Sequence, residues 1–322
     1  MIMQEIEKRR LGKTDIEVTP IGLGAMEFAG GKGFFKFMLG PVEPETQDEV
    51  VKVALDAGMN LIDTAEIYGS GYSERAVARG LKAAGKSPGD VVISTKWFPL
   101  LKRAKSLRKS SKKSTDRLAP YPIDLYLVHM PLSVSSIETQ MNEMADLVEA
   151  GMIRAVGVSN FSKDRMIKAH EALTDRGIPL AANQVNFSLV KRGIEFNGIL
   201  ETAKELGVTI MAYTPLGQGI LTGKLHQNPE LLEVMPRMRR NRLRGNLKKT
   251  QALVETLESI ALELNATAAQ VTLNWTTNFH EDTIIAIPGA SKTYQAEQNA
   301  GAMKLALSSE QMKTISDLSL DL

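Results

Sequence analysis

Eight short apolar runs, each followed by a stretch of helical periodicity, constrain the fold of this chain more than any other feature. The runs are PIGLGAM from Pro20, NLIDT from Asn60, VVISTK from Val91, IDLYLVH from Ile123, IRAVGVSN from Ile153, AANQVNF from Ala181, VTIMAYT from Val208 and TIIAIPG from Thr283. Helical patterns between them cover residues 47–57, 73–84, 137–150, 163–174 and 199–206. A strand, a crossover helix and a parallel strand need roughly 30 residues, which matches this spacing. The alternation predicts a closed (β/α)8 TIM barrel, although a doubly wound sheet would use the same alternation.

Two further segments complete the predicted architecture. RRLGKTDIEVTP, at residues 9–20, precedes the first unit and predicts a short β-hairpin that caps the barrel floor. A long insertion follows strand 7 of the barrel, between the runs at Val208 and Thr283. With 322 residues and 43% hydrophobic content, the chain is long enough to bury a large core. We therefore expect one barrel domain over residues 1–322.

Composition argues against several classes of protein. The absence of cysteine excludes disulfides, thiol catalysis and cysteine-ligated metal sites. No apolar run approaches the roughly 18 residues that a membrane span requires, and MIMQEIEKRR at the start lacks the apolar core of a signal peptide. The four histidines are too scattered for a local pair of metal ligands: His129, His170, His226 and His280. We expect a cytoplasmic protein with no metal site.

The net charge of +2 conceals two basic runs. Residues 101–117 hold eight basic residues and one acidic residue, and residues 237–249 hold seven basic residues and no acidic one. Such runs can attract nucleic acid or a phosphate-bearing ligand. Leu101, Ala104, Leu107 and Leu118 recur at near-helical spacing, so the first run is interpreted as the solvated face of a helix. Neither run has the interleaved aromatic residues of a single-strand binder, which makes nucleic-acid binding the weaker hypothesis.

Three chemically reactive side chains stand at the ends of successive predicted strands. Asp63 and Lys96 are 33 residues apart, as are Lys96 and His129, and Tyr68 follows Asp63 in the same loop. In a barrel, the carboxyl ends of the strands surround one cavity, so these residues should be neighbours. A phenol with a pKa near 10 needs help to donate a proton at neutral pH. A nearby ammonium supplies that help, and a carboxylate keeps the ammonium charged and in place.

Seven motifs resemble those of the aldo-keto reductases, in order and spacing, over nearly the whole chain. They are NLIDTAEIYG, ISTKW, DLYLVHMP, GVSNFS, AANQVNFSL, AYTPLGQGILTGK and IPGASKTYQAEQN. The resemblance implies that Tyr68 is the general acid, that Lys96 and Asp63 tune it, and that His129 orients the substrate carbonyl. It also implies reduction of an aldehyde or ketone by hydride from a nicotinamide cofactor lying across the barrel mouth. A cofactor-binding regulatory or partner protein is the alternative, and the intact set of four residues argues against it.

Later strand ends supply the groups that a nicotinamide cofactor needs. Ser159 with Asn160, and then Gln184, are suited to the carboxamide, and Tyr213 offers a flat surface for the ring. TPLGQG after Tyr213 lets backbone N–H groups approach a pyrophosphate, and Lys224 adds charge. The basic run from residue 237 lies in the same insertion, which we expect to cover the cofactor. The complete set of predicted cofactor contacts is Met26, Asp63, Ser159, Asn160, Gln184, Tyr213, Thr214, Pro215, Leu216, Gly217, Lys224, Gly289, Ser291, Lys292, Gln295, Gln298 and Asn299.

Cofactor choice is predicted from the sequence GASK and the helix expected at 294–303. Ser291 and Lys292 fall at the start of this helix, where phosphate binds well. Lys292 and Gln295 lie in the region where many members of the resembling family use arginine against the 2′-phosphate, so we expect NADP(H). Gln298 departs from the family pattern, because an acid that contacts adenine is expected there.

The predicted substrate pocket is apolar. Phe28, Trp97 and Met130 are the expected substrate contacts, which favours an apolar or aromatic aldehyde or ketone. The segment 30–45 carries three phenylalanines between glycines: Phe34, Phe35 and Phe37. It is interpreted either as a lid over the pocket or as a loop whose aromatic side chains pack beneath it.

Overall fold

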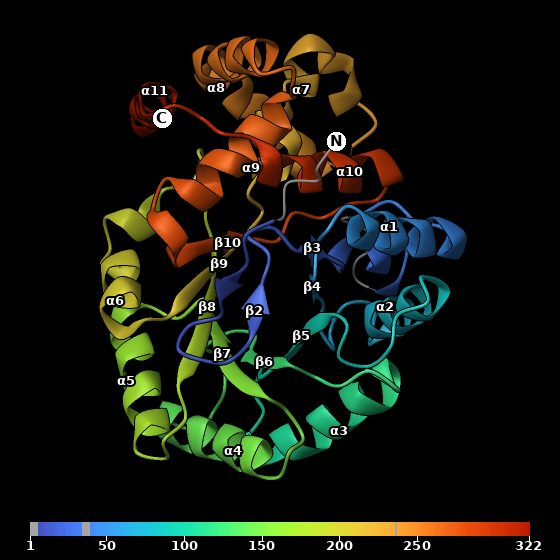
Figure 1. Ribbon diagram of the computed structural model, residues 1–322, viewed down its shortest axis with the longest axis vertical. Coiled ribbons are helices and arrows are strands. Elements are labelled where there is room, and N and C mark those ends of the chain that lie inside the picture. The colour runs from blue at the N-terminus through green and yellow to red at the C-terminus, as the bar shows by residue number, and fades with distance from the viewer. Residues whose placement is uncertain (1–5, 34–38, 236) are drawn as a thin grey trace.

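Eight parallel strands form a barrel in the computed structural model, which describes residues 6–33, 39–235 and 237–322, without the side chains of residues 237–239 and 242 (Figure 1). The strands are β3 (Leu23–Gly24), β4 (Leu61–Asp63), β5 (Val92–Trp97), β6 (Leu125–Val128), β7 (Ala155–Ser159), β8 (Leu180–Asn186), β9 (Thr209–Tyr213) and β10 (Ile284–Ala286). Each pairs in parallel with the next along the chain. Parallel bridges from Ile21 to Ala286 and from Gly24 to Gly289 join the first strand to the last and close the sheet. The fold predicted from the alternation of apolar runs is therefore confirmed.

Helices surround the barrel and cover the outward side chains of the strands. Those that follow the strands are α1 (Pro44–Asp56), α2 (Tyr72–Ala83), α3 (Leu107–Leu118), α4 (Ile137–Glu149), α5 (Lys163–Thr174), α6 (Ile199–Leu206), α9 (Ala268–Asn278) and α10 (Thr293–Gly301), and α11 (Ser309–Leu320) comes last. Local sequence sets several of their ends. The hydroxyl of Ser136 accepts from the backbone N–H of Thr139 at the start of α4, and Thr267 with Gln270 forms a capping box at the start of α9.

Side chains alternate between the two faces of each strand. On β5, Ile93 and Trp97 are fully buried in the core between strands and helices. Ser94 and Lys96 point the other way, into the barrel, where both contact Asp63 of β4. This alternation decides which residues can take part in chemistry at the mouth.

An antiparallel hairpin closes the floor of the barrel, as predicted. Strands β1 (Arg9–Arg10) and β2 (Glu17–Val18) pair with each other and lie over the barrel centre in the view of Figure 1. The hairpin buries Leu11, Ile16 and Val18 against the inward leucines of the strands, such as Leu61 and Leu125. The floor is therefore a dry apolar plug.

The insertion after β9 contains η5 (Gly217–Thr222), α7 (Lys224–Gln227), η6 (Pro229–Leu232) and α8 (Arg237–Glu263). The second basic run forms the first part of α8. Arg240 lies 3.3 Å from a carboxylate oxygen of Glu233, and Arg244 pairs with the other oxygen of the same group. Part of the positive charge is thus neutralised within the insertion.

The first basic run forms α3 and the turn before it. Ala104, Leu107 and Leu118 are buried, as expected for the inner face of a helix. Leu101 was wrongly grouped with them. It precedes the helix with a positive φ of 54° and is 79% exposed, because the chain turns there before α3 begins.

Two predictions concern the surroundings of the barrel. The three phenylalanines of the expected lid, Phe34, Phe35 and Phe37, lie outside the described residues. Among the helices of the described residues, none is both long and apolar enough to cross a membrane.

Candidate active site

A buried ion pair occupies the centre of the barrel mouth. Nζ of Lys96 donates to Oδ2 of Asp63 at 2.6 Å and to the backbone carbonyl of Thr64 at 2.7 Å. The other carboxylate oxygen of Asp63 accepts from Ser94 at 2.8 Å and from Gln184 at 3.0 Å. Both charged groups are nearly inaccessible to water, so each depends on the other and on these hydrogen bonds for solvation.

Tyr68 and His129 complete the group of four that strand-end spacing predicted. Their rings meet edge to face with centroids 5.7 Å apart, and Nζ of Lys96 lies 5.1 Å from the centroid of the Tyr68 ring. Tyr68 reaches this position from the loop after β4, and His129 directly follows β6. The structure thus brings an acid, a lysine, a tyrosine and a histidine to one rim.

Burial dominates the electrostatics of these groups. It raises the pKa of Tyr68 well above that of a free phenol, and Asp63, Tyr213 and Glu27 add to the rise. Burial lowers the pKa of Lys96, and Asp63 opposes that change. The pKa of His129 falls to about 3, first through burial and then through the charge of Lys96. In the described chain, Nδ1 of His129 is buried without a hydrogen-bond partner. At neutral pH, therefore, the phenol is protonated and the imidazole is neutral.

A chain of polar side chains continues the mouth from β7 to β9. The Ser159 hydroxyl donates to the carbonyl of Gln184 at 2.9 Å, and Asn160 donates to the Ser159 oxygen at 2.9 Å. The Tyr213 hydroxyl in turn donates to the side-chain oxygen of Asn160 at 2.9 Å. Asn160 adopts a positive φ of 59°, a conformation that asparagine tolerates better than most residues. The four residues proposed for the nicotinamide form one connected network beside Asp63.

Comparison with known proteins identifies the family. The profile of the Aldo/keto reductase family matches residues 20–319. The chain belongs to this family. It is 30% identical to a probable aldo-keto reductase of Glycine max over 326 residues, covering 98% of this chain and 89% of the relative. An uncharacterized oxidoreductase of Mycobacterium tuberculosis is 34% identical over 307 residues, which cover 94% of this chain and 89% of that protein.

Solved structures of aldo-keto reductases superpose over almost the whole chain. A thermostable aldo-keto reductase crystallised with the inhibitor epalrestat is 29% identical with a TM-score of 0.76, covering 97% of this chain and 99% of that one. The glycerol dehydrogenase of Gluconobacter oxydans is 28% identical with a TM-score of 0.80, covering 98% and 95%. Aldo-keto reductases are oxidoreductases that act on small carbonyl compounds and typically use a nicotinamide cofactor.

The loop after β9 combines residues of positive φ with a glycine that faces open space. Thr214 and Gly217 have positive φ, and a side chain added at Gly219 would meet no other atom within 4 Å. Pro215 is buried and Leu216 is half-buried between them. Nζ of Lys224 lies 3.0 Å from the hydroxyl of Tyr294 on α10. The insertion and α10 therefore meet at a cation that borders this loop.

Donors converge at the start of α10 on a single oxygen. The side-chain oxygen of Gln295 accepts from the backbone N–H of Ser291 at 2.8 Å, from its hydroxyl at 3.2 Å and from the N–H of Lys292 at 3.1 Å. This oxygen occupies the place that an anion takes at a helix N-terminus. The residues present thus fit a phosphate, which would displace the Gln295 amide.

The remaining predicted contacts at α10 differ in exposure. Asn299 is buried and donates to the carbonyl of Gly289 at 3.5 Å, so it supports the backbone that precedes the helix. Gln298 is half-buried. At Gly289, a side chain would approach Glu27 to within 2.9 Å, so this glycine permits close packing of the first and last loops of the barrel.

Two of the expected substrate contacts face away from the mouth. Phe28 and Trp97 are fully buried in the core between strands and helices, and the Trp97 indole donates to Ser106 at 3.2 Å. Those two predictions are corrected here, because side chains without exposed surface cannot touch a substrate in this conformation. Met130 is half-buried next to His129, and Met26 packs beside Tyr68.

Sequence reasoning missed Phe98. Its ring meets that of His129 edge to face, with centroids 5.9 Å apart. The signal was present in the strand alternation: Lys96 points into the barrel, so Trp97 must point outward and Phe98 inward again. Ser94 was also missed, although it lies two residues before Lys96 and so points into the barrel as well.

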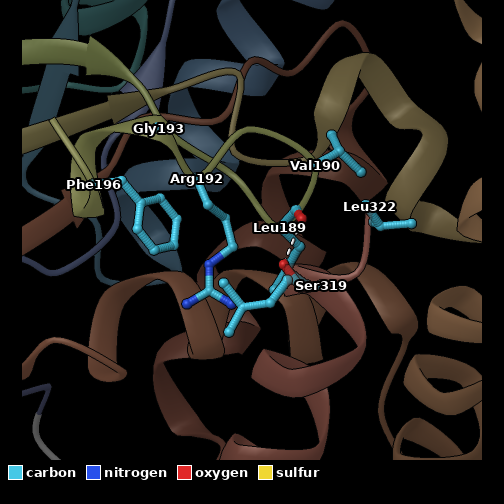
Figure 2. A pocket seen from close by; sticks show the side chains of 8 residues that line it. Leu189, Val190, Arg192, Gly193, Phe196, Ser319 and Leu322 are labelled. Carbon is cyan, nitrogen blue, oxygen red and sulfur yellow. Dashed lines mark hydrogen bonds between the residues drawn. The ribbon is translucent and has the colours of Figure 1, made fainter.

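Two surface cavities of about 170 Å³ each lie at the edge of the barrel. Neither is lined by any of the four predicted catalytic residues, which are Asp63, Tyr68, Lys96 and His129. One separates the loop after β8 from the end of α11, and Figure 2 shows Phe196 and Arg192 on one side of it and Leu322 on the other. Arg192 there already pairs with Glu195. The second lies beside the start of α4, between Pro131 and Arg165. Neither cavity therefore includes the charged groups that converge at the mouth.

Proposed function

We propose that this aldo-keto reductase reduces aldehydes and ketones to alcohols with NADPH, and that Tyr68 is the general acid. The observation that carries the proposal is the buried Lys96–Asp63 pair, 2.6 Å long, directly beneath the ring of Tyr68. When bound, the reduced nicotinamide supplies the hydride. The residues of the chain then have to deliver one proton and hold the carbonyl in place.

Tyr68 is the proton donor in this proposal. Its raised pKa keeps the phenol protonated in the resting enzyme, so the proton is available when negative charge develops on the substrate oxygen. The ammonium of Lys96 stabilises the phenolate that remains after transfer. Asp63 keeps Lys96 charged despite burial, because the pair shares a short hydrogen bond in a site that is nearly inaccessible to water.

His129 orients the substrate in this proposal. With its pKa lowered to about 3, the imidazole is neutral and has one N–H to donate to the carbonyl oxygen. It shares the rim with Tyr68, so both groups can reach the same oxygen. The side chains of Phe98 and Met130 lie next to His129 and favour an apolar or aromatic carbonyl compound as substrate.

The proposed cofactor contacts extend from Met26 and Asp63 through the Ser159–Tyr213 network to α10. Ser291 and Lys292 would receive the 2′-phosphate of NADP(H), and the convergence of their donors on the Gln295 oxygen supports this assignment. The Gln295 side-chain oxygen already accepts hydrogen bonds from these donors, and a charged phosphate oxygen would be a stronger acceptor.

The direct test is a panel of aldehydes and ketones followed by NADPH consumption, with wild type and Tyr68→Phe in parallel. Losing a general acid costs roughly 10²- to 10⁴-fold in rate. Cofactor affinity should hardly change, because only the transition state requires the proton. A Tyr68→Phe enzyme that turns over normally when chemistry is rate-limiting would refute the assignment of Tyr68.

A further inference from the structure

A second buried ion pair lies behind the mouth, outside the four residues assigned to the reaction. Arg117, the last residue of the first basic run, donates through Nε to Glu74 and through a terminal nitrogen to Ser114 at 3.1 Å. The Glu74 side chain has no exposed surface, and only 17% of the Arg117 side chain is exposed. The pair connects α2 with α3, which are neighbours in Figure 1. A buried pair of this kind is costly to desolvate and is weak evidence for stability alone.

Arg117 supports the loop that carries Tyr68. A side-chain carbon added at Gly71 would come within 2.4 Å of the Cδ and Nε atoms of Arg117, so the loop backbone lies directly on the guanidinium. Residues Gly69, Ser70 and Gly71 all have positive φ. Such a conformation persists where surrounding contacts hold it in place. The backbone N–H of Ser73, next to Glu74, donates to the carbonyl of Tyr68 at 3.2 Å.

Glu74 also contacts the strand that carries Lys96. Its second carboxylate oxygen accepts from the hydroxyl of Thr95 on β5 at 2.7 Å. Since side chains alternate, Thr95 points outward to Glu74 while Lys96 points inward to Asp63. The ionisable groups that act on or face Lys96 are Asp63, Tyr68, His129 and Glu74. One buried pair thereby holds both the loop of Tyr68 and the strand of Lys96.

We propose that Arg117 and Glu74 are positioning residues of the reaction, which fix the Tyr68 loop relative to Lys96 so that the phenol and the ammonium stay in register. This inference rests on the proposed function. It assigns a role to one residue of the first basic run, Arg117 on α3. The pair acts through the backbone of residues 69–73 and through Thr95, and it touches neither substrate nor cofactor.

Strand β5 offers a matched control at its opposite end, near the barrel floor. Asp124 is buried near the barrel floor, where it accepts from the backbone N–H of Ile93 at 2.8 Å and from Arg154 at 2.9 Å. This pair also ties β5 to a buried carboxylate, but it lies away from the Tyr68 loop. Comparing the two pairs separates positioning from a general effect of removing a buried ion pair.

The experiment compares two double variants that each remove both charges of the pair and so leave no buried ion unpaired: Glu74→Gln with Arg117→Met, and Asp124→Asn with Arg154→Met. The first should lower the single-turnover rate of carbonyl reduction by about 10- to 100-fold with unchanged NADPH affinity, as expected for a displaced catalytic group. The second should keep the wild-type rate per folded molecule. Arg117→Lys, which retains the charge beside Glu74, should restore most of the rate.

Hydrogen exchange of residues 65–73 gives a second readout that does not require turnover. Exchange there should rise in the Glu74/Arg117 variant and stay unchanged in the Asp124/Arg154 variant. Three results would each overturn the inference. They are a wild-type rate in the Glu74/Arg117 variant, an equal loss of rate in the two variants, and unchanged exchange at residues 65–73 in the Glu74/Arg117 variant. If the wild-type protein reduces no carbonyl compound, the proposed function fails, and the exchange comparison still decides whether the pair holds the loop.

Discussion

The two ends of the barrel are built from the same strands but contain opposite chemistry. On β4, Leu61 points into the floor, and two residues later Asp63 points into the mouth. On β6, Leu125 and Leu127 belong to the floor, and His129 follows at the rim. Two residues along a strand therefore separate an apolar plug, which stabilises the fold, from a buried polar site, which is costly to build. Changes at the two ends should have separable effects on stability and on rate.

The largest expected effect is at the mouth. Lys96→Met removes the cation next to Tyr68, so the phenolate loses its stabilisation and the rate should fall by roughly 10²- to 10⁴-fold. The apparent pKa of the acid in the pH–rate profile should rise. Pre-steady-state kinetics across a pH series measure both quantities, and thermal melting shows whether the variant is folded. An unchanged rate and profile would place Lys96 outside the reaction.

At the floor, Leu125→Ala should reverse this pattern. Removing a fully buried leucine costs about 2 to 5 kcal/mol of the free energy of unfolding, because a cavity remains. The rate per folded molecule should stay at the wild-type value, since the side chain is remote from Tyr68. Urea unfolding and active-site titration test the two parts separately. A large loss of rate with little loss of stability would contradict the division between the two ends.

An acid-dependent effect on stability comes from His129. The unfolded chain binds a proton there below about pH 6.5, whereas the lowered pKa delays this to about 3 in the folded protein, so stability is lost as the pH falls through this window. A decrease of two pH units below 6.5 should cost about 2 to 3 kcal/mol through this group. His129→Gln should lack that part of the loss. Urea unfolding at pH 6.5 and about two pH units lower, in wild type and His129→Gln, measures how much of the free energy of unfolding each protein loses. Equal losses in the two proteins would refute the prediction.

The smallest effect is expected at the edge of the mouth. Lys292→Ala removes the charged contact that we propose to the 2′-phosphate, and such a contact is worth roughly 1.5 to 3 kcal/mol, so NADPH should bind about tenfold to a hundredfold more weakly. NADH affinity should hardly change, and added salt should reduce the preference in wild type as well. Fluorescence titration of both cofactors measures this. Equal weakening of NADPH and NADH would show that the phosphate lies elsewhere.

The arrangement of strands was predictable because it depends on local periodicity. Each apolar run has the length of one strand, and the 33-residue spacing of Asp63, Lys96 and His129 follows from one repeat of the barrel unit. Their meeting at one rim is a consequence of closing the sheet. The chemical roles assigned to these residues stay predictions until the variants are measured.

Contacts between separate elements were not predictable in the same way. Trp97 was named as a substrate contact, but its side chain is fully buried on the outer face of β5, and it is the ring of Phe98 that meets His129. The pair of Glu74 and Arg117 joins residues 43 positions apart on two helices, and no motif marks it. The Gln295 oxygen at the start of α10 depends on a side-chain rotamer, which the sequence does not specify.

The hairpin under the barrel also bears on how the protein is made. Arg9 donates to the carbonyl of Ile284 at 2.9 Å, across 275 positions of sequence. A ribosome adds about 5 to 20 residues per second, so the hairpin waits on the order of 10 to 60 seconds for the strand that completes its binding site. Until then, Leu11, Ile16 and Val18 lack two of their final neighbours, Ile285 and Ile287. The hairpin is thus synthesised well before the strand that it contacts in the folded protein.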